Sequence, residues 1–585
     1  MRIPLAAPLA LFLLGGLLGL PVSYDPLLSA PWLLWLATGA LLYIALIWLV
    51  GASGRPELAA GLAVLAATGG ALLIIGQYRH LGFDAKFGMV TRIGTWLSAP
   101  VPALPLPHID PNAAAAFLVG GVPLALGLAL AARGPARLGW LGGAALVGLA
   151  VLLTASRGAW AALAAVALLG ALGWAVLHLP PRRVALLALL GALLIPLALW
   201  LLLARTPTVA GALALRAADR LTVYRNDLFL ALDLPFSGIG PGAAFGEVYS
   251  RLQLLIQVPF IGYAHNLLLG AWLAQGLLGL LGLLWLVLGA AARITARLRT
   301  EGGPLAWGAA LAAATPLLHG LTDAPQYDTA WTALLMGFAL LAVAVAEPRT
   351  KNQEPRTAEH GNAKTQSGKD AKQQTDPCVF ASLTRFQRAL QFGGKKGGVG
   401  ASPHIPPYPP WRRNETLSLR LCISLLVLAV LLARPVGAAG CANAAALLRT
   451  QALLRPGLDE QARAGLRAEA LVWAERGLWL DAGSTAALKQ RGMLAFDAQQ
   501  FGRAAELLAL AFAQRPADQS LRKALGYALL WNGRVDQAAD LLSGLTYAGE
   551  VREELTVWPV AWRERGREDL ARLAEQLGQT LDARR

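Results

Sequence analysis

The chain is poor in charged residues for its length. Of its 585 residues only 15% are charged, whereas 56% are apolar, and the mean hydropathy is +0.50. A water-soluble domain carries about 25% charged residues, so most of this chain belongs in lipid. Charged residues become frequent only from about residue 350 onward. A membrane region is therefore followed by a more ordinary water-exposed region.

Cysteine is scarce as well, and the three cysteines, Cys378, Cys422 and Cys441, show no metal-binding spacing. The sequence therefore predicts neither a zinc site nor a disulfide framework. It has no nucleophile elbow, and its GGKKGGVG stretch lacks the phosphate-loop sequence and follows no strand. The formal net charge of +16 falls mainly in short loops and one linker, which is typical of membrane topology. We expect no metal, no cofactor and no nucleic-acid partner.

Long apolar runs predict an all-α fold, a polytopic membrane bundle over residues 1–347. A helix needs about 20 apolar residues to cross a bilayer. Ten runs qualify: 4–22, 31–50, 57–76, 113–132, 138–155, 158–178, 184–204, 264–290, 304–320 and 329–346. A shorter eleventh run near 419–434 predicts an additional transmembrane helix within residues 416–440.

The short loops fix the orientation of these spans, because Lys and Arg favour the cytoplasmic side. With the N-terminus inside, every short basic loop is cytoplasmic: Arg55, Arg133 and Arg137, Arg182 and Arg183, and Arg293, Arg297 and Arg299. The charge-poor connections then face outward, and with them a large periplasmic loop at residues 205–263.

Two further regions follow the membrane domain. Residues 348–415 are basic and proline-rich with few aliphatic residues, which predicts a disordered cytoplasmic linker. Residues 445–585 show amphipathic helices in which GMLAFDAQQFGRAAELL, from Gly492, matches GYALLWNGRVDQAADLL, from Gly526, at an offset of 34. That period indicates a small tetratricopeptide-like α-solenoid, with a plain helical bundle as the alternative. A solenoid on the periplasmic side offers a surface for a protein or glycan partner.

Arginines gather on the predicted outer face. Arg157 lies in the short turn of residues 153–160, LTASRGAW, close to the bilayer. Arg216, Arg220 and Arg225 follow in the large loop, where the first two are four residues apart and share a helix face. Ionisable groups at membrane depth are costly and point to function, and a guanidinium offers forked donors to a phosphate. The alternatives are interface anchoring for Arg157 and a solvated face for the loop arginines.

Two histidines lie on the same face. His265 and Asn266 stand where the outer loop enters the eighth span, and His319 and Asp323 lie four residues apart at the outer end of the ninth. That spacing predicts a pair in which the Asp323 carboxylate orients the His319 imidazole. A structural role for His265 and a helix-end polar cluster at 319–323 are the alternatives.

Together these segments resemble the O-antigen ligase and O-antigen polymerase family of bacterial inner-membrane proteins, over roughly residues 60–345. The resemblance is carried by TASRGAW at 154–160, RLTVYRNDLFLALDLPFSGIGPG at 220–242, AHN at 264–266 and HGLTD at 319–323. Members with a C-terminal tetratricopeptide region are known, so the resemblance extends in outline to the chain's end. Where the family commonly has tryptophan this chain has Tyr224, which leaves open whether Arg220 or Arg225 is the main loop arginine.

The resemblance implies transfer of a glycan from an undecaprenyl-diphosphate-linked donor to an acceptor hydroxyl at the periplasmic face of the inner membrane, in cell-surface polysaccharide biosynthesis. It implies that Arg157 and Arg220 stabilise the departing diphosphate without a metal, and that His265 takes or orients the acceptor proton. The residues expected to bind substrate are Arg225, Arg216, Asn266, His319 and Asp323. The expected partners are this donor, a lipid or protein acceptor, membrane lipids and a protein on the solenoid.

Several functions share this pattern. Ligation to a lipid acceptor, polymerisation of O-antigen or exopolysaccharide units, and protein O-oligosaccharyl transfer all use the same donor, and the sequence favours none of them. Outside this class, a transporter would show internal repeats and broken helices near the middle of the membrane. A non-catalytic scaffold would only display the solenoid.

The topology makes a direct prediction about the C-terminus. A reporter enzyme that works only in the periplasm, fused after Arg585, is expected to be active, because Arg412, Arg413 and Arg420 flank the inner side of the eleventh span. A silent periplasmic reporter together with an active cytoplasmic one at the same position would contradict this orientation.

Overall fold

The computed structural model describes residues 3–83, 87–186, 190–191, 205, 207–259, 261–327, 331–347, 411–546 and 548–584, without side-chain detail for 207–217, 331, 411–430 and 548. Every regular element in these ranges is helical. The predicted linker at 348–415 and the predicted seventh span at 184–204 lie almost entirely outside the described residues. The segments Met1–Thr350 and Leu432–Arg585 form one compact unit.

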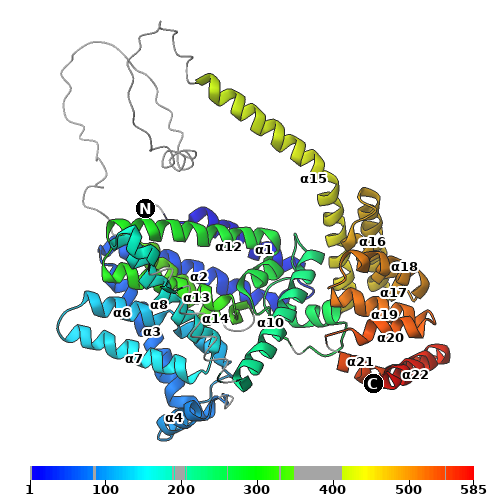
Figure 1. The fold of residues 1–585 in the computed structure, drawn as a ribbon, viewed down its shortest axis with the longest axis horizontal. Helices are drawn as coiled ribbons and strands as arrows, with labels where there is room; N and C mark the ends of the chain where they lie inside the picture. The colour runs from blue at the N-terminus through cyan, green and yellow to red at the C-terminus, as the bar shows by residue number, and fades with distance from the viewer. Residues whose placement is uncertain are drawn as a thin grey trace. The chain divides into compact units, whose positions relative to one another are not determined.

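The membrane region is built from apolar helices that follow the predicted spans (Figure 1). They are α1 (Ala6–Val22), α2 (Pro26–Ser53), α3 (Pro56–Gln77), α5 (Pro111–Leu118) with α6 (Gly121–Ala131), α7 (Pro135–Leu153), α8 (Arg157–His178), α12 (Leu267–Thr300), α13 (Pro304–Gly320) and α14 (Trp331–Val345). In the described part of the chain, seven helices are long and apolar enough to cross a membrane, including the α15 segment Leu431–Leu454. The chain is a multi-pass membrane protein.

Small residues let these helices approach closely. Where α6 crosses α13, a Cβ on Gly127 would lie 2.7 Å from the Gly308 Cα, so neither position has room for a side chain. Gly15 of α1 and Gly279 of α12 meet in the same way, and α1 and α12 run side by side (Figure 1). Close backbone approach gives helices in lipid the van der Waals contact that replaces a hydrophobic driving force.

The basic C-terminus of α12 and the segments that carry Asn266 and Leu321 lie at opposite ends of the bundle. At the basic end of α12, Arg297 donates to the carbonyls of Val343 and Ala344, and Arg293 pairs with Glu347, so the C-termini of α12 and α14 meet. The start of α12 and the end of α13 lie at the opposite end of the bundle, where Asn266 donates to the Leu321 carbonyl.

Helix α12 is broken at Gly276, whose φ of 65° and ψ of −168° are not helical. The turn after α10 (Pro207–Asp233) fills this break: Pro235 O accepts Leu277 N at 3.0 Å, and Ile239 N donates to Leu273 O at 2.6 Å. The backbone groups freed by the break therefore find partners in the turn, as a buried backbone requires. Short helices α11 (Ala244–Val248) and η2 (Tyr249–Leu254), a π-helical turn, complete the large loop.

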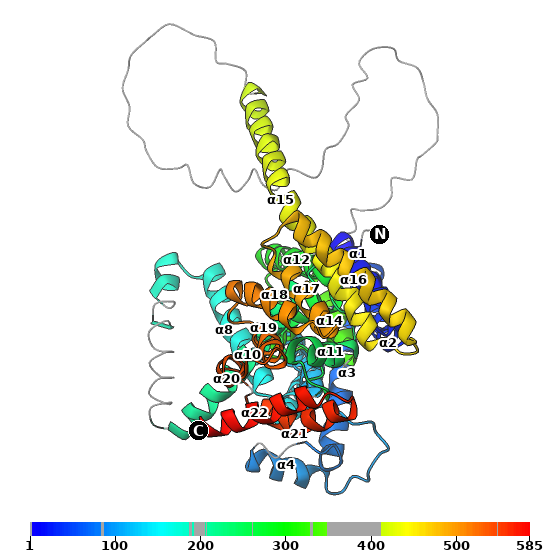
Figure 2. The same ribbon diagram turned by 90° about the vertical axis from the view of Figure 1, so that its right-hand side faces the viewer.

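The C-terminal region is a stack of helix pairs, seen in the orange and red ribbons of Figure 2. It comprises α16 (Glu460–Leu480), α17 (Thr485–Asp497), α18 (Phe501–Gln514), α19 (Gln519–Trp531), α20 (Val535–Ser543), α21 (Ala548–Glu564) and α22 (Glu568–Ala583). A Cβ on Gly492 would lie 2.8 Å from Leu508, and one on Gly526 would lie 2.7 Å from Leu542. Residues 34 positions apart thus make the same close contact in successive repeats. The predicted all-α fold, a membrane bundle followed by a repeat solenoid, is confirmed.

The solenoid begins earlier than the sequence pattern indicates. Helix α15 runs without interruption over Trp411–Leu454, so the expected boundary between 440 and 445 falls inside one helix. Ala438, Ala442 and Ala445 are buried, and Ala445 packs with Ala470 and Ala474 of α16. The small residues that look like the end of a transmembrane run therefore form the packing face of the first solenoid helix.

Gly276→Ala tests the role of the break in α12. A Cβ there would overlap the Phe236 carbonyl, and a left-handed φ costs a non-glycine residue about 1–2 kcal/mol by itself. We expect a lower unfolding temperature in detergent and loss of the folded fraction. Gly148→Ala in α7 is the matched control, because its Cβ would meet nothing within 4 Å. Equal unfolding temperatures for the two variants would contradict the packing described here.

Candidate functional site

The four sequence segments singled out above meet at the end of the bundle opposite the C-termini of α12 and α14. The central contact joins His265, which precedes α12, to Asp323, which follows α13: Nδ1 lies 3.0 Å from the carboxylate Oδ1. Arg220 of α10 lies on the other carboxylate oxygen, with Nη2 3.7 Å from Oδ2. Asp323 is therefore shared by a histidine and an arginine from two other segments.

The predicted pairing of Asp323 with His319 is not formed. The i, i+4 rule that suggested it holds within a helix, but α13 ends at Gly320 and the chain turns there. The backbone amide of Asp323 still donates to the His319 carbonyl, at 2.9 Å, while its side chain points to His265. The turn thus redirects the carboxylate to a residue 58 positions away.

The surroundings of Asp323 keep it ionised. Burial alone would raise the pKa of this carboxyl, but the hydrogen bond and charge of His265, the charge of Arg220 and a hydrogen bond from Tyr263 together hold it below its usual value. Tyr263 stacks edge-on against His265 with ring centroids 4.6 Å apart. Burial and the nearby Asp323 raise the pKa of the Tyr263 hydroxyl, so this hydroxyl stays protonated and acts as a donor.

Two polar side chains fix the backbone around this contact. The Tyr224 hydroxyl lies 3.1 Å from the carbonyl oxygens of both His265 and Leu321, and it thereby bridges the two segments that carry the pair. Asn266 caps α12, accepting from Leu268 N at 3.0 Å, and donates to Leu321 O at 3.1 Å. Tyr224, the departure from the family pattern, therefore has a defined structural role.

The turn that carries Arg157 packs against His319 through Gly158. Ser156 caps α8, and the turn before it is tight, with Ala155 at a φ of 53°. A Cβ on Gly158 would lie 3.2 Å from His319 Cδ2, so the turn that carries Arg157 packs directly on this histidine. His319 is buried and its Nε2 has no hydrogen-bond partner among the described residues.

The remaining expected residues do not join the cluster in the same way. Arg225 is five residues beyond Arg220, roughly 140° around an ideal helix of 3.6 residues per turn, and its Nε is buried without a hydrogen-bond partner in the described part of the chain. The side chain of Arg216 lies outside the described residues. Sequence reasoning missed Tyr263, although it lies two residues before His265, and it noted Tyr224 only as a departure from the family pattern.

An apolar cavity of about 330 Å³ lies beside this cluster. Side chains of α1, α12, α13 and α14 line it, among them Phe12, Leu286, Ile294, Leu334 and Phe338. Leu267 and Tyr327 also line it; Leu267 directly follows Asn266, and Tyr327 lies four residues beyond Asp323. The lining of the cavity thus includes residues close in the chain to the polar cluster.

Two segments of the chain are similar to known protein families. The profile of the O-antigen ligase family matches residues 142–284, and a tetratricopeptide repeat profile matches residues 495–554. The segment of residues 142–284 is therefore similar to an O-antigen ligase domain. The matched segment of the ligase domain holds Arg157, Arg220 and His265, whereas Asp323 lies beyond it. No curated protein matches the chain. The ligase domain supports a role of the ligase or polymerase type in polysaccharide biosynthesis, by glycosyl transfer.

Asp323→Asn tests the central contact through the pH dependence of stability. Because the folded pKa of Asp323 lies below the unfolded value of about 3.9, its contribution is complete above that value and is lost as the pH falls through the folded pKa. We expect the variant to be less stable by about 1–3 kcal/mol at pH 7. The difference from the wild type should shrink between about pH 5 and pH 3.

Thermal unfolding in detergent measures this difference across the pH range. Asp219→Asn, at an exposed position of α10, is the control and should not change the pH profile. A stability difference for Asp323→Asn that stays constant down to pH 3 would show that the carboxylate charge is not the stabilising element.

Proposed function

We propose that the protein transfers a glycan from an undecaprenyl-diphosphate-linked donor to an acceptor hydroxyl at the periplasmic face of the inner membrane. The observation that carries this proposal is the sharing of Asp323 by His265 and Arg220, in a bundle that also holds an apolar cavity lined by Leu267 and Tyr327. In this proposal His265 is the base, Arg220 is the cation that binds the diphosphate, and the cavity holds the prenyl chain.

The tautomer of His265 follows from its partner. An ionised carboxylate only accepts hydrogen bonds, so Nδ1 carries the proton toward Asp323, and the Nε2 lone pair is left as the base. Asp323 orients the imidazole through this hydrogen bond. His265 is 19% exposed, so an acceptor can reach it from the outer side.

The proposed reaction is a direct displacement. The acceptor hydroxyl oxygen attacks the anomeric carbon as its proton passes to His265 Nε2, and the bond from that carbon to the diphosphate oxygen breaks. The bonding electrons leave with the diphosphate, whose new charge Arg220 and Arg157 stabilise. Arg220 retains free donors for this role, because a guanidinium has five N–H groups and this side chain is 39% exposed.

The cavity supports a polyprenyl-linked donor in particular. Its lining is mostly apolar and comes largely from the helices of the membrane bundle. A chain of isoprene units placed there would set its diphosphate at the level of Arg157 and Arg220. Transfer to a lipid, to a growing glycan or to a protein hydroxyl uses the same groups, and the acceptor decides among them.

The same geometry and the loop charges support the periplasmic location of the site. The outer cluster lies opposite the basic α12 and α14 ends, which the loop charges assign to the cytoplasm. The break in α12 does not support a transporter, since the freed backbone groups bond to residues 235–239 rather than facing a cavity. A scaffold remains the alternative that the following experiment excludes or supports.

Replacing the site residues should abolish transfer without abolishing folding. Arg157→Lys or Arg220→Lys removes a forked donor, and loss of one donor to a developing anion costs about 2.7–4 kcal/mol, or roughly a hundredfold to a thousandfold in rate. His265→Ala should cost roughly a hundredfold or more, with donor binding nearly intact. Transfer from a purified undecaprenyl-diphosphate-linked glycan is measured on protein folded in detergent.

Arg137→Lys is the matched control, because this exposed arginine lies at the N-terminal end of α7, on the predicted cytoplasmic side. It should transfer at the wild-type rate. Near-normal transfer by both Arg157→Lys and His265→Ala would favour the scaffold over the enzyme.

A further inference from the structure

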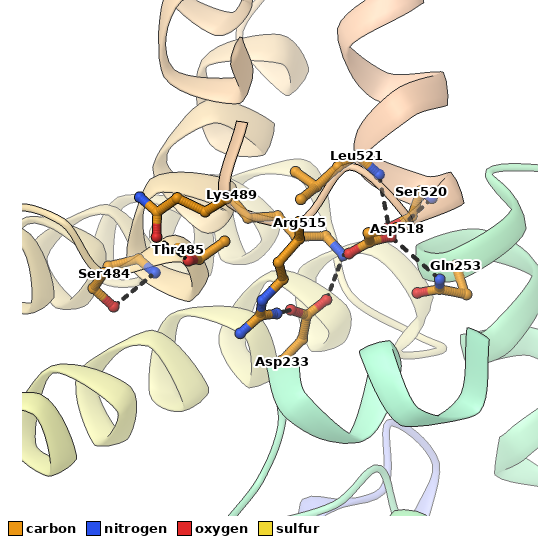
Figure 3. Close-up of polar contacts among 11 residues, drawn as sticks. Asp233, Gln253, Ser484, Thr485, Lys489, Arg515, Asp518, Ser520 and Leu521 are labelled. Carbon is orange, nitrogen blue, oxygen red and sulfur yellow. Dashed lines mark hydrogen bonds and ion pairs between the residues drawn. The ribbon is translucent and has the colours of Figure 1, made fainter. Parts of the chain in front are cut away.

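The solenoid touches the large loop of the ligase domain through a buried ionic network (Figure 3). Lys489 of α17 places Nζ 2.5 Å from the Asp233 carboxylate and 3.1 Å from the Asp518 carboxylate. All three side chains are at most 7% exposed. Arg515 adds a second cation at 3.4 Å from Asp233. Charged groups this deeply buried are stable only when paired.

The surroundings of Lys489 and Asp518 favour the charged form of each. Burial lowers the pKa of the Lys489 ammonium, but Asp233 and Asp518 outweigh this effect and raise it. Burial opposes ionisation of Asp518, yet Lys489, Ser520 and the Leu521 amide hold its pKa below the usual value. Burial raises the pKa of the Asp233 carboxyl against the opposing charges of Lys489 and Arg515. We therefore take Lys489 and Asp518 as an ion pair at neutral pH.

Two more side chains of the solenoid hold backbone of the same loop. Asn443 of α15 accepts from Phe236 N at 3.0 Å and Ser237 N at 3.2 Å, and it donates to Ser237 Oγ at 2.9 Å. Lys523 of α19 donates to the carbonyl of Leu254 at 3.0 Å. We call Asn443, Lys489, Asp518 and Lys523 the solenoid clamp.

Apolar contacts cover the same interface from both sides. Leu255, at the end of η2, packs against the hydrophobic core of the solenoid. In return Ala446, Leu447 and Leu454 of α15 pack in the cluster formed by the ligase loop. Leu255 has a φ of 55°, a conformation that a leucine adopts only when its surroundings hold it there.

We propose that the solenoid clamp positions the donor-binding arginine of the ligase domain, and that the chain's own loop occupies this face of the repeats in place of a separate protein partner. This inference rests on the proposed function for its catalytic consequence, and on the contacts above for the docking itself. Lys489 and Asn443 are positioning residues in this account.

The path from clamp to site is short. Asp233 is the last residue of α10, the helix that carries Arg220 and Tyr224. Asn443 holds the turn whose backbone fills the break in α12, and α12 begins directly after His265 and Asn266. Both sides of the site, the arginine and the histidine, are therefore attached to segments that the solenoid holds.

Cross-linking tests the docking without reference to activity. Ser237→Cys with Asn443→Cys, in a chain whose native cysteines are replaced by serine, is treated with a short reducible bis-thiosulfonate reagent in the full-length protein. We expect an intramolecular link between the two positions, identified by mass spectrometry of the monomer band, with either single variant as control. Absence of this link in folded protein would overturn the proposal.

Glycan transfer by the same cross-linked protein shows whether the docked solenoid positions the site or inhibits it. If the docked arrangement is the active one, transfer by the linked protein equals that of the unlinked protein within about twofold. Transfer that disappears on linking and returns on reduction would show that the solenoid must leave, which contradicts the positioning role. If the wild type transfers nothing from the lipid-linked donor while the link forms, the proposed function fails and the docking stands. Binding of undecaprenyl diphosphate then replaces turnover as the readout in the variants below.

Removal of the Lys489 ammonium tests the positioning residue. Asp233→Asn with Lys489→Met deletes the contact between these two side chains and leaves no buried carboxylate at 233. Asp518 loses its ion pair with Lys489 but keeps its hydrogen bonds with Ser520 and the Leu521 amide. We expect kcat per folded molecule to fall about tenfold to a hundredfold, the size expected when a reacting group is displaced by about 1 Å. The acceptor KM should change by less than about threefold, since Asp233 lies on the helix that carries Arg220, on the donor side, and neither replaced residue belongs to the acceptor side.

Arg503→Met is the matched control, because its side chain is 57% exposed and pairs only with Glu506 among the described residues. It should leave kcat unchanged. A folded double variant with wild-type kcat, or with wild-type affinity for undecaprenyl diphosphate where that is the readout, would overturn the positioning role of Lys489.

Discussion

The Asp323 carboxylate is the interaction on which the rest of the site depends. It is nearly buried and accepts from His265 and Tyr263, with Arg220 on its other oxygen, so segments from three parts of the chain converge on one charge. Removing a shared buried acceptor leaves each donor without a partner. Its ionisation also selects the tautomer that leaves His265 Nε2 available as a base. The chemistry proposed for the site therefore follows from the location of one carboxylate.

That carboxylate is useful only because the backbone around it is rigid. The break in α12 at Gly276 admits the turn at 235–239, and the hydrogen bonds exchanged there tie α10 to α12. Tyr224 and Asn266 then tie both helices to the turn after α13. Preorganised groups act on a developing charge without reorganising during the reaction. A loop that would otherwise be mobile thus becomes a fixed part of the helical bundle.

Much of the fold could be predicted because it follows from local patterns. Apolar runs give the membrane helices, and the offset of 34 gives the repeats, since Gly492 and Gly526 make equivalent contacts. The sequence identified the segments that form the site, but it did not identify which side chains contact one another. The pairing of His265 with Asp323 spans 58 residues and depends on the end of α13, which no spacing rule encodes. Local spacing instead suggested His319, which packs on the turn of Arg157.

Three other features could not be predicted from the sequence, because they too depend on tertiary contacts. The start of the solenoid inside α15 looks like transmembrane sequence, because a packing face of alanines has the same composition as a membrane helix. Lys489 and Asp233 each look like an ordinary surface charge, and only the tertiary fold buries them against each other. Tyr263 gave no sequence sign of its contact with Asp323, because an aromatic residue before a membrane helix usually marks the lipid interface.

The most direct test of the account is the position of the carrier. A structure of the protein in a lipid nanodisc with undecaprenyl diphosphate should show the diphosphate within about 4 Å of Arg157 and Arg220, the range of an ion pair. Its prenyl chain should enter the cavity lined by Phe12 and Phe338, with His265 facing the site of the transferred sugar. A diphosphate bound away from these arginines, or at the basic ends of α12 and α14, would contradict the account.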